Sequence, residues 1–164
     1  MTFTLEETSI AELHIIAQSA IPERIAPHVA EGALPPAFVA LRTLSQIDEG
    51  KSRYWCRTFY IVRDDDQAIV GSCGFKNAPA AGCIEIGYGV SPSCRRQGAA
   101  TAAVDALLGL AFATEEVDQV LAQVNLDNEA STRVVQKLNF ENSGIQLDED
   151  EEPAIQWLAY RWFR

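Results

Sequence analysis

The sequence lacks long apolar runs and is poor in positive charge. Its 164 residues include 13 Lys and Arg against 23 Asp and Glu, a formal net charge of −10. No stretch approaches the roughly 18 apolar residues of a membrane span, and the start, MTFTLEETSI, lacks the basic and apolar regions of a signal peptide. The acidic balance argues against nucleic-acid binding, which needs Lys and Arg to neutralise phosphates. We therefore expect a cytoplasmic protein with no membrane partner and no nucleic-acid partner.

Residues that bind metals or form disulfides are also scarce. The cysteines, at positions 56, 73, 83 and 94, form no C-x-x-C pair, and His14 and His28 stand alone. This spacing gives a zinc site little support, so we expect no metal. We interpret Cys73 and Cys83, which lie in apolar, strand-like contexts, as small buried hydrophobes. A Cys–His nucleophilic pair stays open as an alternative, although the spacing does not indicate one. A chain of this length can bury about two-thirds of its unfolded surface, so it needs no disulfide or metal for stability.

No low-complexity linker and no internal repeat divides the chain, so we expect a single domain over residues 1–164. Residues 1–57 predict a weak strand over Thr2–Leu5, a helix capped by Ser9 and Glu12, a short helical piece from Pro22, and a helix after Pro36. The expected strands then cover 58–63, 68–75, 84–90, 119–124, a short segment from 140, and 155–163, and the expected helices cover 98–112 and 128–138. This order predicts an α/β fold with a sheet of mixed direction.

The charge is distributed unevenly along the chain. Residues 51–100 carry a net charge of +3, whereas residues 1–50 carry −5 and residues 101–164 carry −8. An anionic ligand held by the middle part of the chain would explain this asymmetry. Chance combined with local charge pairing would explain it equally well.

The most informative segment joins an expected strand to an expected buried helix. It reads VSPSCRRQGAAT over residues 90–101 and places Arg95 and Arg96 just before Gly98. A glycine and small residues at a helix start leave backbone N–H groups free to face a ligand, and the helix dipole adds about half a positive elementary charge. These features favour a pyrophosphate site, although an ordinary basic turn has the same composition. The segment is neither a Walker A loop nor a dinucleotide fingerprint, because GK[ST] and G-x-G-x-x-G are both absent.

Two motifs resemble those of the GNAT N-acetyltransferases. Arg95-x-x-Gly98-x-Ala100 is similar to the family's R/Q-x-x-G-x-G/A motif, and NEASTRVVQKLNF over residues 128–140 is similar to its N-x-x-S…KLGF segment. The resemblance covers roughly residues 58–163 and is closest to the enzymes that acetylate N-termini of ribosomal proteins (RimJ and RimL type). It implies a GNAT-like α/β fold, in which helices flank a central mixed, mostly antiparallel sheet of six to seven strands. Residues 1–57 fit the variable N-terminal helical part of such proteins.

The resemblance implies an acetyl-CoA-dependent N-acetyltransferase, which moves an acetyl group to a primary amine of a small molecule or a protein N-terminus. The amine attacks directly in a ternary complex. The amides of residues 97–101 would hold the pyrophosphate of acetyl-CoA, and the backbone near Val90 and the Asn128 side chain would contact its pantetheine arm. The implied cosubstrate-binding residues are Val90, Arg95, Arg96, Gln97, Gly98, Ala99, Ala100, Thr101 and Asn128.

Two catalytic residues are implied, and each has a plainer alternative. Glu85 matches an acidic residue common in the subgroup and would take a proton from the acceptor amine through water. Its alternative is a surface or salt-bridged glutamate. Ser131 matches a serine that serves the subgroup as general acid to the leaving thiol, and its alternative is a residue that only helps to cap a helix.

Two positions depart from the family pattern. Val135 stands where many members have a tyrosine that acts as general acid, and Asn139 replaces the glycine of KLGF. Asn tolerates the left-handed backbone conformation, so the turn can survive. The departures keep an alternative function open, namely a catalytically inactive GNAT-like domain that binds acyl-CoA or a partner protein.

The acceptor is determined least by the sequence. The acidic run Asp148–Glu152 lies between the last two expected strands, and in this fold that loop can border the acceptor cleft. A cationic amine such as a polyamine, an aminoglycoside or a basic peptide N-terminus would suit it, whereas a solvated acidic loop would have the same sequence. Monomer and homodimer both stay open.

Overall fold

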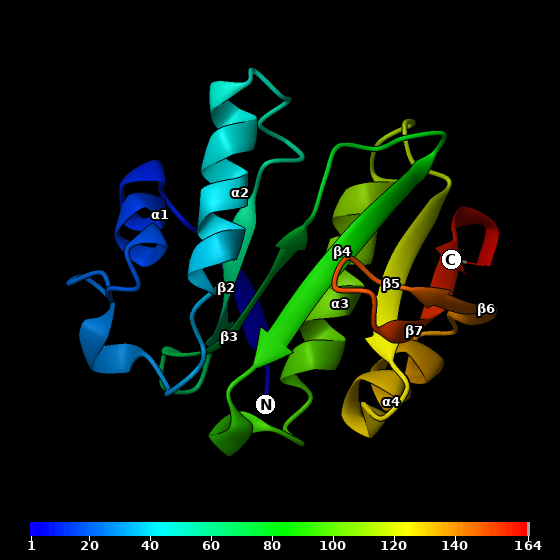
Figure 1. Ribbon diagram of the computed structural model, residues 1–164. Helices are drawn as coiled ribbons and strands as arrows, with labels where there is room; N and C mark the ends of the chain where they lie inside the picture. Colours follow the sequence, from blue (N-terminus) through cyan, green and yellow to red (C-terminus); the bar gives the residue numbers. More distant parts are fainter. Residues whose placement is uncertain (164) are drawn as a thin grey trace.

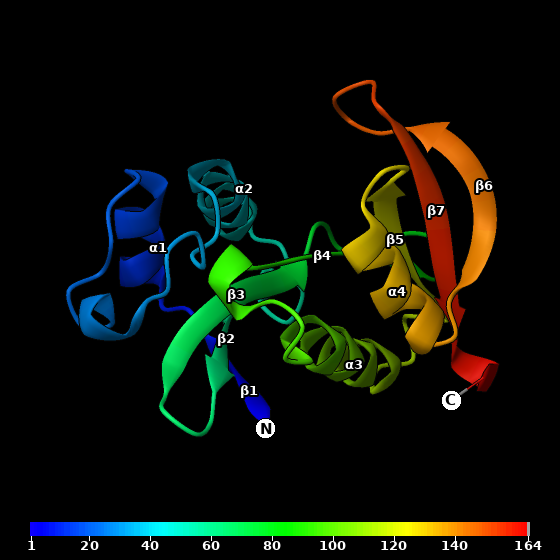
Figure 2. The ribbon, with the colours of Figure 1, turned by 90° about the horizontal axis from the view of Figure 1, so that it is seen from below.

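A seven-stranded sheet forms the centre of the protein, and helices cover both of its faces (Figure 1, Figure 2). The structure is a computed structural model, and it describes residues 1–163. The helices are α1 (Ile10–Ala17), α2 (Ala37–Asp48), α3 (Ala99–Phe112) and α4 (Glu129–Lys137), and the strands are β1 (Phe3–Glu7), β2 (Thr58–Arg63), β3 (Ala68–Phe75), β4 (Cys83–Val90), β5 (Gln119–Asn125), β6 (Glu141–Leu147) and β7 (Pro153–Tyr160). This architecture confirms the mostly antiparallel α/β fold of six to seven strands.

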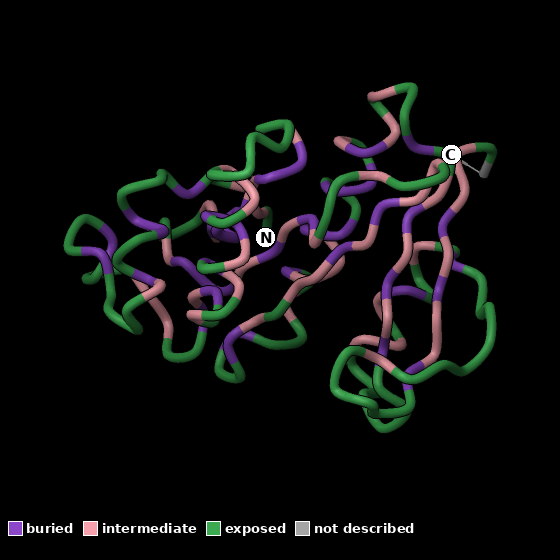
Figure 3. The backbone as a smooth tube through the Cα atoms, turned by 45° about the horizontal axis from the view of Figure 1, so that its top comes forward, coloured by how far each residue is buried: buried purple, intermediate pink, exposed green. Residues whose placement is uncertain are grey.

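The strand order is β1-β2-β3-β4-β5-β7-β6, and the only parallel pair in this sheet of residues 1–163 is β4 with β5. α3 connects these two strands, because a parallel pair needs a crossover that returns the chain to the same end of the sheet. At the far edge, β6 is exposed along its whole length (Figure 3). The parallel pair therefore lies in the middle of the sheet, between two antiparallel halves.

The two faces of the sheet have separate apolar cores. On one face, Leu13 and Ile16 of α1 and Leu44 of α2 pack against Tyr60 of β2 and Ile69 of β3. On the other face lie α3 and Val135 of α4. α3 buries the side chains of Ala99, Ala103, Val104, Leu107, Leu108 and Ala111, and each fully buried leucine contributes about 1.5–3 kcal/mol. This packing fixes the N-terminus of α3 relative to the end of β4.

Several element boundaries differ from the sequence expectation, and those of β7, of β6 and of the helical piece after Pro22 differ most clearly. The strand expected over 155–163 ends at Tyr160, because the Arg161 guanidinium donates to the carbonyls of Phe112, Thr114 and Val117 and the chain turns into a 3-10 turn. β6 begins at Glu141 rather than at residue 140, whose side chain is buried in the core. The helical piece expected from Pro22 is a 3-10 turn over residues 26–28.

The cysteines are free thiols. Cys56, Cys73 and Cys94 are buried and Cys83 is half-buried, and burial raises the pKa of the Cys73 thiol well above its ordinary value. In residues 1–163, no group of three or more His, Cys, Asp or Glu is placed to hold a metal ion. None of the helices described is long and apolar enough to cross a membrane.

A buried carboxylate fastens α1 to the sheet. Ser9 caps α1 by accepting from the Glu12 backbone N–H at 3.1 Å, as predicted. The Glu12 carboxylate accepts from both Arg24 Nε and Nη2, at 2.9 and 3.0 Å, and from the Tyr60 hydroxyl at 3.0 Å. The Arg24 hydrogen bonds are the main reason that the pKa of Glu12 is lowered, while burial is the main reason that the pKa of Tyr60 is raised.

We expect Glu12→Gln to lower the free energy of unfolding by about 1–2 kcal/mol at pH 7, because it removes the charge that Arg24 and Tyr60 face. A lowered carboxyl pKa stabilises the fold above its ordinary value of 4.5, and this contribution is lost as the pH falls through the lower folded value. The difference between wild type and variant in urea unfolding should therefore shrink below about pH 4.5.

Glu6→Gln is the matched control, because Glu6 pairs with the same Arg24 but has a side chain that is 45% exposed. We expect it to change the unfolding free energy by less than about 0.5 kcal/mol. A pH-independent cost of Glu12→Gln would contradict the proposed role of the charge.

Candidate active site

The parallel pair β4–β5 separates soon after it forms. Backbone pairing joins Cys83 to Gln119, Ile84 to Val120 and Glu85 to Leu121, and then stops. Beyond this point the two strands diverge, as Figure 1 shows. The β4 edge over residues 86–90 therefore faces a gap in the middle of the sheet, where an extended ligand could pair with it as an added strand.

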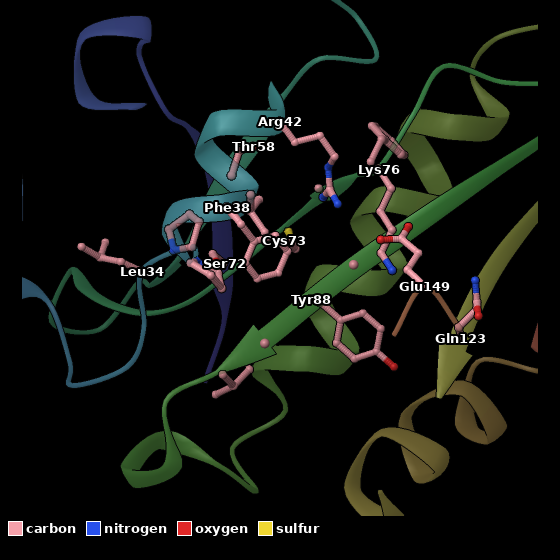
Figure 4. Close-up of a pocket in the computed structure, with 18 of the residues that line it drawn as sticks. Leu34, Phe38, Arg42, Thr58, Ser72, Cys73, Lys76, Tyr88, Gln123 and Glu149 are labelled. Carbon is pink, nitrogen blue, oxygen red and sulfur yellow. The ribbon is translucent and has the colours of Figure 1, made fainter. Parts of the chain in front are cut away.

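A pocket of about 400 Å³ opens beside this gap, on the face that carries α2 (Figure 4). Its wall is formed by α2 and the loop before it, by β2, β3 and β4, by the end of β5, and by the β6–β7 loop. The polar and charged side chains in this wall are those of Arg42, Thr58, Ser72, Lys76, Tyr88, Gln123, Asn125, Asp148, Glu149 and Asp150. Elements from both ends of the chain thus meet at the site.

The expected pyrophosphate cradle lies at the far end of β4. A 3-10 turn over residues 92–94 leads into the basic loop, and Gly98 is the N-cap of α3 with φ +89°. No side chain caps this helix, so its first backbone N–H groups can face an anion. A Cβ at Gly98 would meet no atom within 4 Å, so within the chain the positive φ alone calls for glycine.

The basic side chains of the cradle are exposed. Arg95 and Arg96 form no ion pair within residues 1–163, and Arg96 has φ +62°. Gln97 is held by Arg63, whose Nη1 donates to its side-chain oxygen at 2.8 Å, and Arg63 also pairs with Asp66 at 2.8 Å. The place of Arg63 at the cradle could not be predicted from the sequence, because no sequence pattern relates residues 34 positions apart.

Glu85 lies beside the pocket, on the sheet face of Gly87 and Gly89, and contacts Lys76 and Gln123, which line it. Lys76 Nζ lies 2.8 Å from Glu85 Oε2, and Gln123 Nε2 donates to the same oxygen at 3.2 Å. Gly87 leaves room for the lysine chain, since a Cβ there would approach Lys76 Cε to 3.3 Å. Glu85 is therefore a salt-bridged glutamate, as the alternative interpretation expected. If it accepts a proton, it does so while in contact with Lys76 and Gln123.

Asn128 and Ser131 begin α4 on the other side of the gap. The Asn128 side-chain oxygen accepts from the Ser131 backbone N–H at 3.1 Å, which is the predicted N-cap. The Ser131 hydroxyl lies 2.5 Å from the Tyr88 hydroxyl of β4. Val135 is fully buried in the core, and Asn139 has φ +64°, so asparagine does occupy the left-handed position of the missing glycine.

Tyr88 is the site residue that strand alternation did not identify. Alternation puts it on the apolar face of β4, and its ring does pack against the core under α3. Its hydroxyl nevertheless reaches α4 and its ring lines the pocket (Figure 4). Burial raises the pKa of Tyr88, and the hydrogen bond with Ser131 opposes this rise. The only signal in the sequence was a hydroxyl among aliphatic neighbours.

The acidic β6–β7 loop borders the pocket. Asp148, Glu149 and Asp150 line it, opposite Arg42 of α2. The loop is held by its own first residue, because Asp148 Oδ1 accepts from the backbone N–H groups of Asp150 and Glu152, both at 2.9 Å. The pocket wall thus carries an ordered acidic segment.

The chain belongs to the GNAT acetyltransferase family. The family described as "Acetyltransferase (GNAT) domain" matches residues 7–141, which is most of the chain. This match confirms the family expected from the two motifs and includes much of the segment before residue 58.

Individual proteins agree with this assignment. The uncharacterized N-acetyltransferase YjdG of Bacillus subtilis (strain 168) is 36% identical over 84 residues, which cover 51% of this chain and 50% of YjdG. The chain spans about half the length of the curated relatives it matches. Ribosomal-protein-S5-alanine acetyltransferase from Vibrio fischeri has the same fold, with a TM-score of 0.69, 15% identity, and coverage of 98% of this chain and 93% of that one. Aminoglycoside acetyltransferase AAC(6')-Ib in complex with coenzyme A gives a TM-score of 0.67 at 18% identity, with 98% and 96% covered.

We expect Gly98→Ala to lower the unfolding free energy by about 1 kcal/mol, because the positive φ of Gly98 is unfavourable for a residue with a Cβ. Gly109→Ala is the matched control, since Gly109 lies inside α3 with nothing within 4 Å of an added Cβ. It should stabilise the protein by up to about 1 kcal/mol. Urea unfolding of both variants checks the pair, and equal effects of the same sign would contradict the assigned backbone geometry.

Proposed function

We propose that this protein is an acetyl-CoA-dependent N-acetyltransferase that moves an acetyl group to a primary amine. The observation that carries the proposal is the separation of β4 from β5, because the pocket lies beside the freed part of β4 and the cradle follows the end of this strand. An elongated cosubstrate fits this arrangement, because its anionic end can lie at the cradle while its acetyl group reaches the acceptor in the pocket. Membership of the GNAT family supports the same reaction.

In this proposal the cradle binds the anionic part of acetyl-CoA. The backbone N–H groups of residues 97–101 bind the pyrophosphate, and the exposed side chains of Arg95 and Arg96 add two positive charges. The Val90 backbone and Asn128 contact the pantetheine arm across the gap. A backbone N–H of the unpaired β4 edge then polarises the thioester carbonyl and stabilises the oxyanion that forms on attack.

In the proposed reaction Glu85 prepares the acceptor amine. An alkyl ammonium has a pKa of about 10.4, so a proton must leave before attack. Glu85 forms the last backbone pair between β4 and β5. It lies two residues before Gly87, which lines the pocket. We propose that it takes this proton through water, while the hydrogen bond from Gln123 holds its orientation.

The proposed acceptor is a cationic amine. Three acidic residues of the β6–β7 loop line the pocket, and they would attract a second positive charge of the acceptor. Proteins of the same fold act on ribosomal protein and on aminoglycosides according to their names, which supports an amine acceptor of either size. A measurement of the molecular mass in solution distinguishes a monomer from a homodimer.

We propose that residues 1–164 act as one domain, with residues 1–57 contributing to the acceptor side, since α2 supplies part of the pocket wall. We also propose a cytoplasmic location. The free cysteines support it, because reducing compartments preserve thiols.

Acetyl-CoA should raise the unfolding temperature, whereas ATP and NAD should not. At 100 times its dissociation constant a ligand stabilises the fold by about 2.7 kcal/mol, which is roughly 5–10 °C for a domain of this size. Arg95→Ala combined with Arg96→Ala should weaken acetyl-CoA binding about tenfold, while Arg53→Ala, outside the cradle, should have no effect. Equal shifts with all three ligands would contradict a CoA site.

Release of free CoA in the presence of an amine panel separates an enzyme from an inactive binding domain. We expect Glu85→Gln to reduce turnover about a hundredfold with polyamine acceptors, and Ser131→Ala to reduce it less. Lys76→Met is the matched control, because it breaks the same ion pair and leaves the carboxylate. Comparable turnover in Glu85→Gln and Lys76→Met would assign Glu85 a structural role only.

A further inference from the structure

We propose that Tyr88 is a positioning residue for Ser131: its phenol donates a hydrogen bond to Ser131 Oγ and so directs the serine proton toward the sulfur of the departing CoA. The inference rests on the proposed acetyl transfer. It deepens that function by giving a role to the hydroxyls of Tyr88 and Ser131, which join β4 to α4.

The geometry places this pair where the leaving group would be. Tyr88 comes from the part of β4 that no longer pairs with β5, and Ser131 comes from the first turn of α4. Their hydroxyl oxygens are 2.5 Å apart although the residues are 43 positions apart in the chain. Tyr88 also lines the pocket (Figure 4). The pair therefore joins β4 to α4 next to the gap between β4 and β5, at the edge of the pocket.

The short distance between the two oxygens is compatible with either hydroxyl as donor, and the proposal assigns the phenol as the donor. A phenol, with an ordinary pKa near 10, is a stronger donor than an aliphatic hydroxyl. Burial raises the pKa of Tyr88, which keeps its proton in place. Each hydroxyl has one proton, so donation by Tyr88 leaves the Ser131 proton free. Asn128 engages only the Ser131 backbone N–H, so among residues 1–163 the hydroxyl of Ser131 has Tyr88 as its hydrogen-bond partner.

The free serine proton stabilises the leaving group. When the amine nitrogen has bonded to the thioester carbon, the carbon–sulfur bond breaks and its electron pair moves to sulfur. Ser131 Oγ–H then donates a hydrogen bond to that thiolate. The amine loses one proton and the sulfur gains one. Amine and thioester therefore become amide and thiol with no other reactant. Val135 is fully buried and carries no hydroxyl, so that position of α4 offers no alternative donor.

The direct test is the ionisation of CoA bound to the protein, followed by the ultraviolet absorbance of the thiolate. A group that stabilises the leaving thiolate also lowers the pH at which the bound thiol ionises. We expect Ser131→Ala and Tyr88→Phe each to move this ionisation to higher pH, by up to about one unit. The double variant should move it no further than Ser131→Ala alone, because Tyr88 acts through Ser131.

Tyr54→Phe is the matched control. It also removes a tyrosine hydroxyl, which donates to the Leu110 carbonyl at 2.6 Å outside the site, so bound CoA should ionise as in the wild type. Turnover should fall about tenfold in Tyr88→Phe with the acetyl-CoA KM unchanged.

Three results would overturn the proposal. An unchanged CoA ionisation in Tyr88→Phe, with CoA still bound, removes the positioning role and leaves acetyl transfer intact. A loss of thermal stability or CoA affinity with unchanged ionisation makes the pair a structural link between β4 and α4. If the wild type does not bind CoA, both this inference and the proposed function are wrong.

Discussion

The site depends on a parallel strand pair that cannot stay together. β4 is bound along its other edge to β3, and β5 is bound along its whole length to β7. Each antiparallel half of the sheet has its own twist and its own neighbours, so the pair holds over three residues and then opens. The opening leaves backbone N–H and C=O groups of β4 without a strand partner, and such groups need a partner or water. In the proposed function, the extended cosubstrate takes the place of the missing strand partner.

Local signals in the sequence predicted local structure well. The caps at Ser9 and Asn128, and the glycine that begins α3, are set by residues within a few positions of each other. The contacts that define the site were not predictable in this way. Ser131 meets Tyr88 from 43 positions away, and Gln97 meets Arg63 from 34. Strand alternation identifies the face on which a side chain lies, but it does not identify what its terminal hydroxyl or guanidinium will touch.

The positive middle of the chain has two separate explanations. Arg53, Arg57, Arg63 and Lys76 all lie in ion pairs, so local pairing accounts for most of the basic residues there. Arg95 and Arg96 have no such partner within residues 1–163 and stand exposed beside the uncapped start of α3. An exposed pair of arginines next to free helix N–H groups is where an anion is bound most favourably. Net charge alone could not distinguish these two groups of residues.

The two faces of the sheet divide the work that the proposed reaction requires. The acidic loop and Glu85 lie on the face of α2, whereas Ser131 and α4 lie on the face of α3. Tyr88 connects the two, because its ring lines the pocket and its hydroxyl contacts Ser131. An acceptor entering from the first face would meet a thioester lying in the gap, and the leaving sulfur would face the hydroxyl pair on the second. Groups that handle the incoming amine and the outgoing thiol are thereby kept apart, so a carboxylate and a proton donor can act in one site without neutralising each other. The separation of β4 from β5 makes this arrangement possible, because a continuous sheet would seal one face from the other.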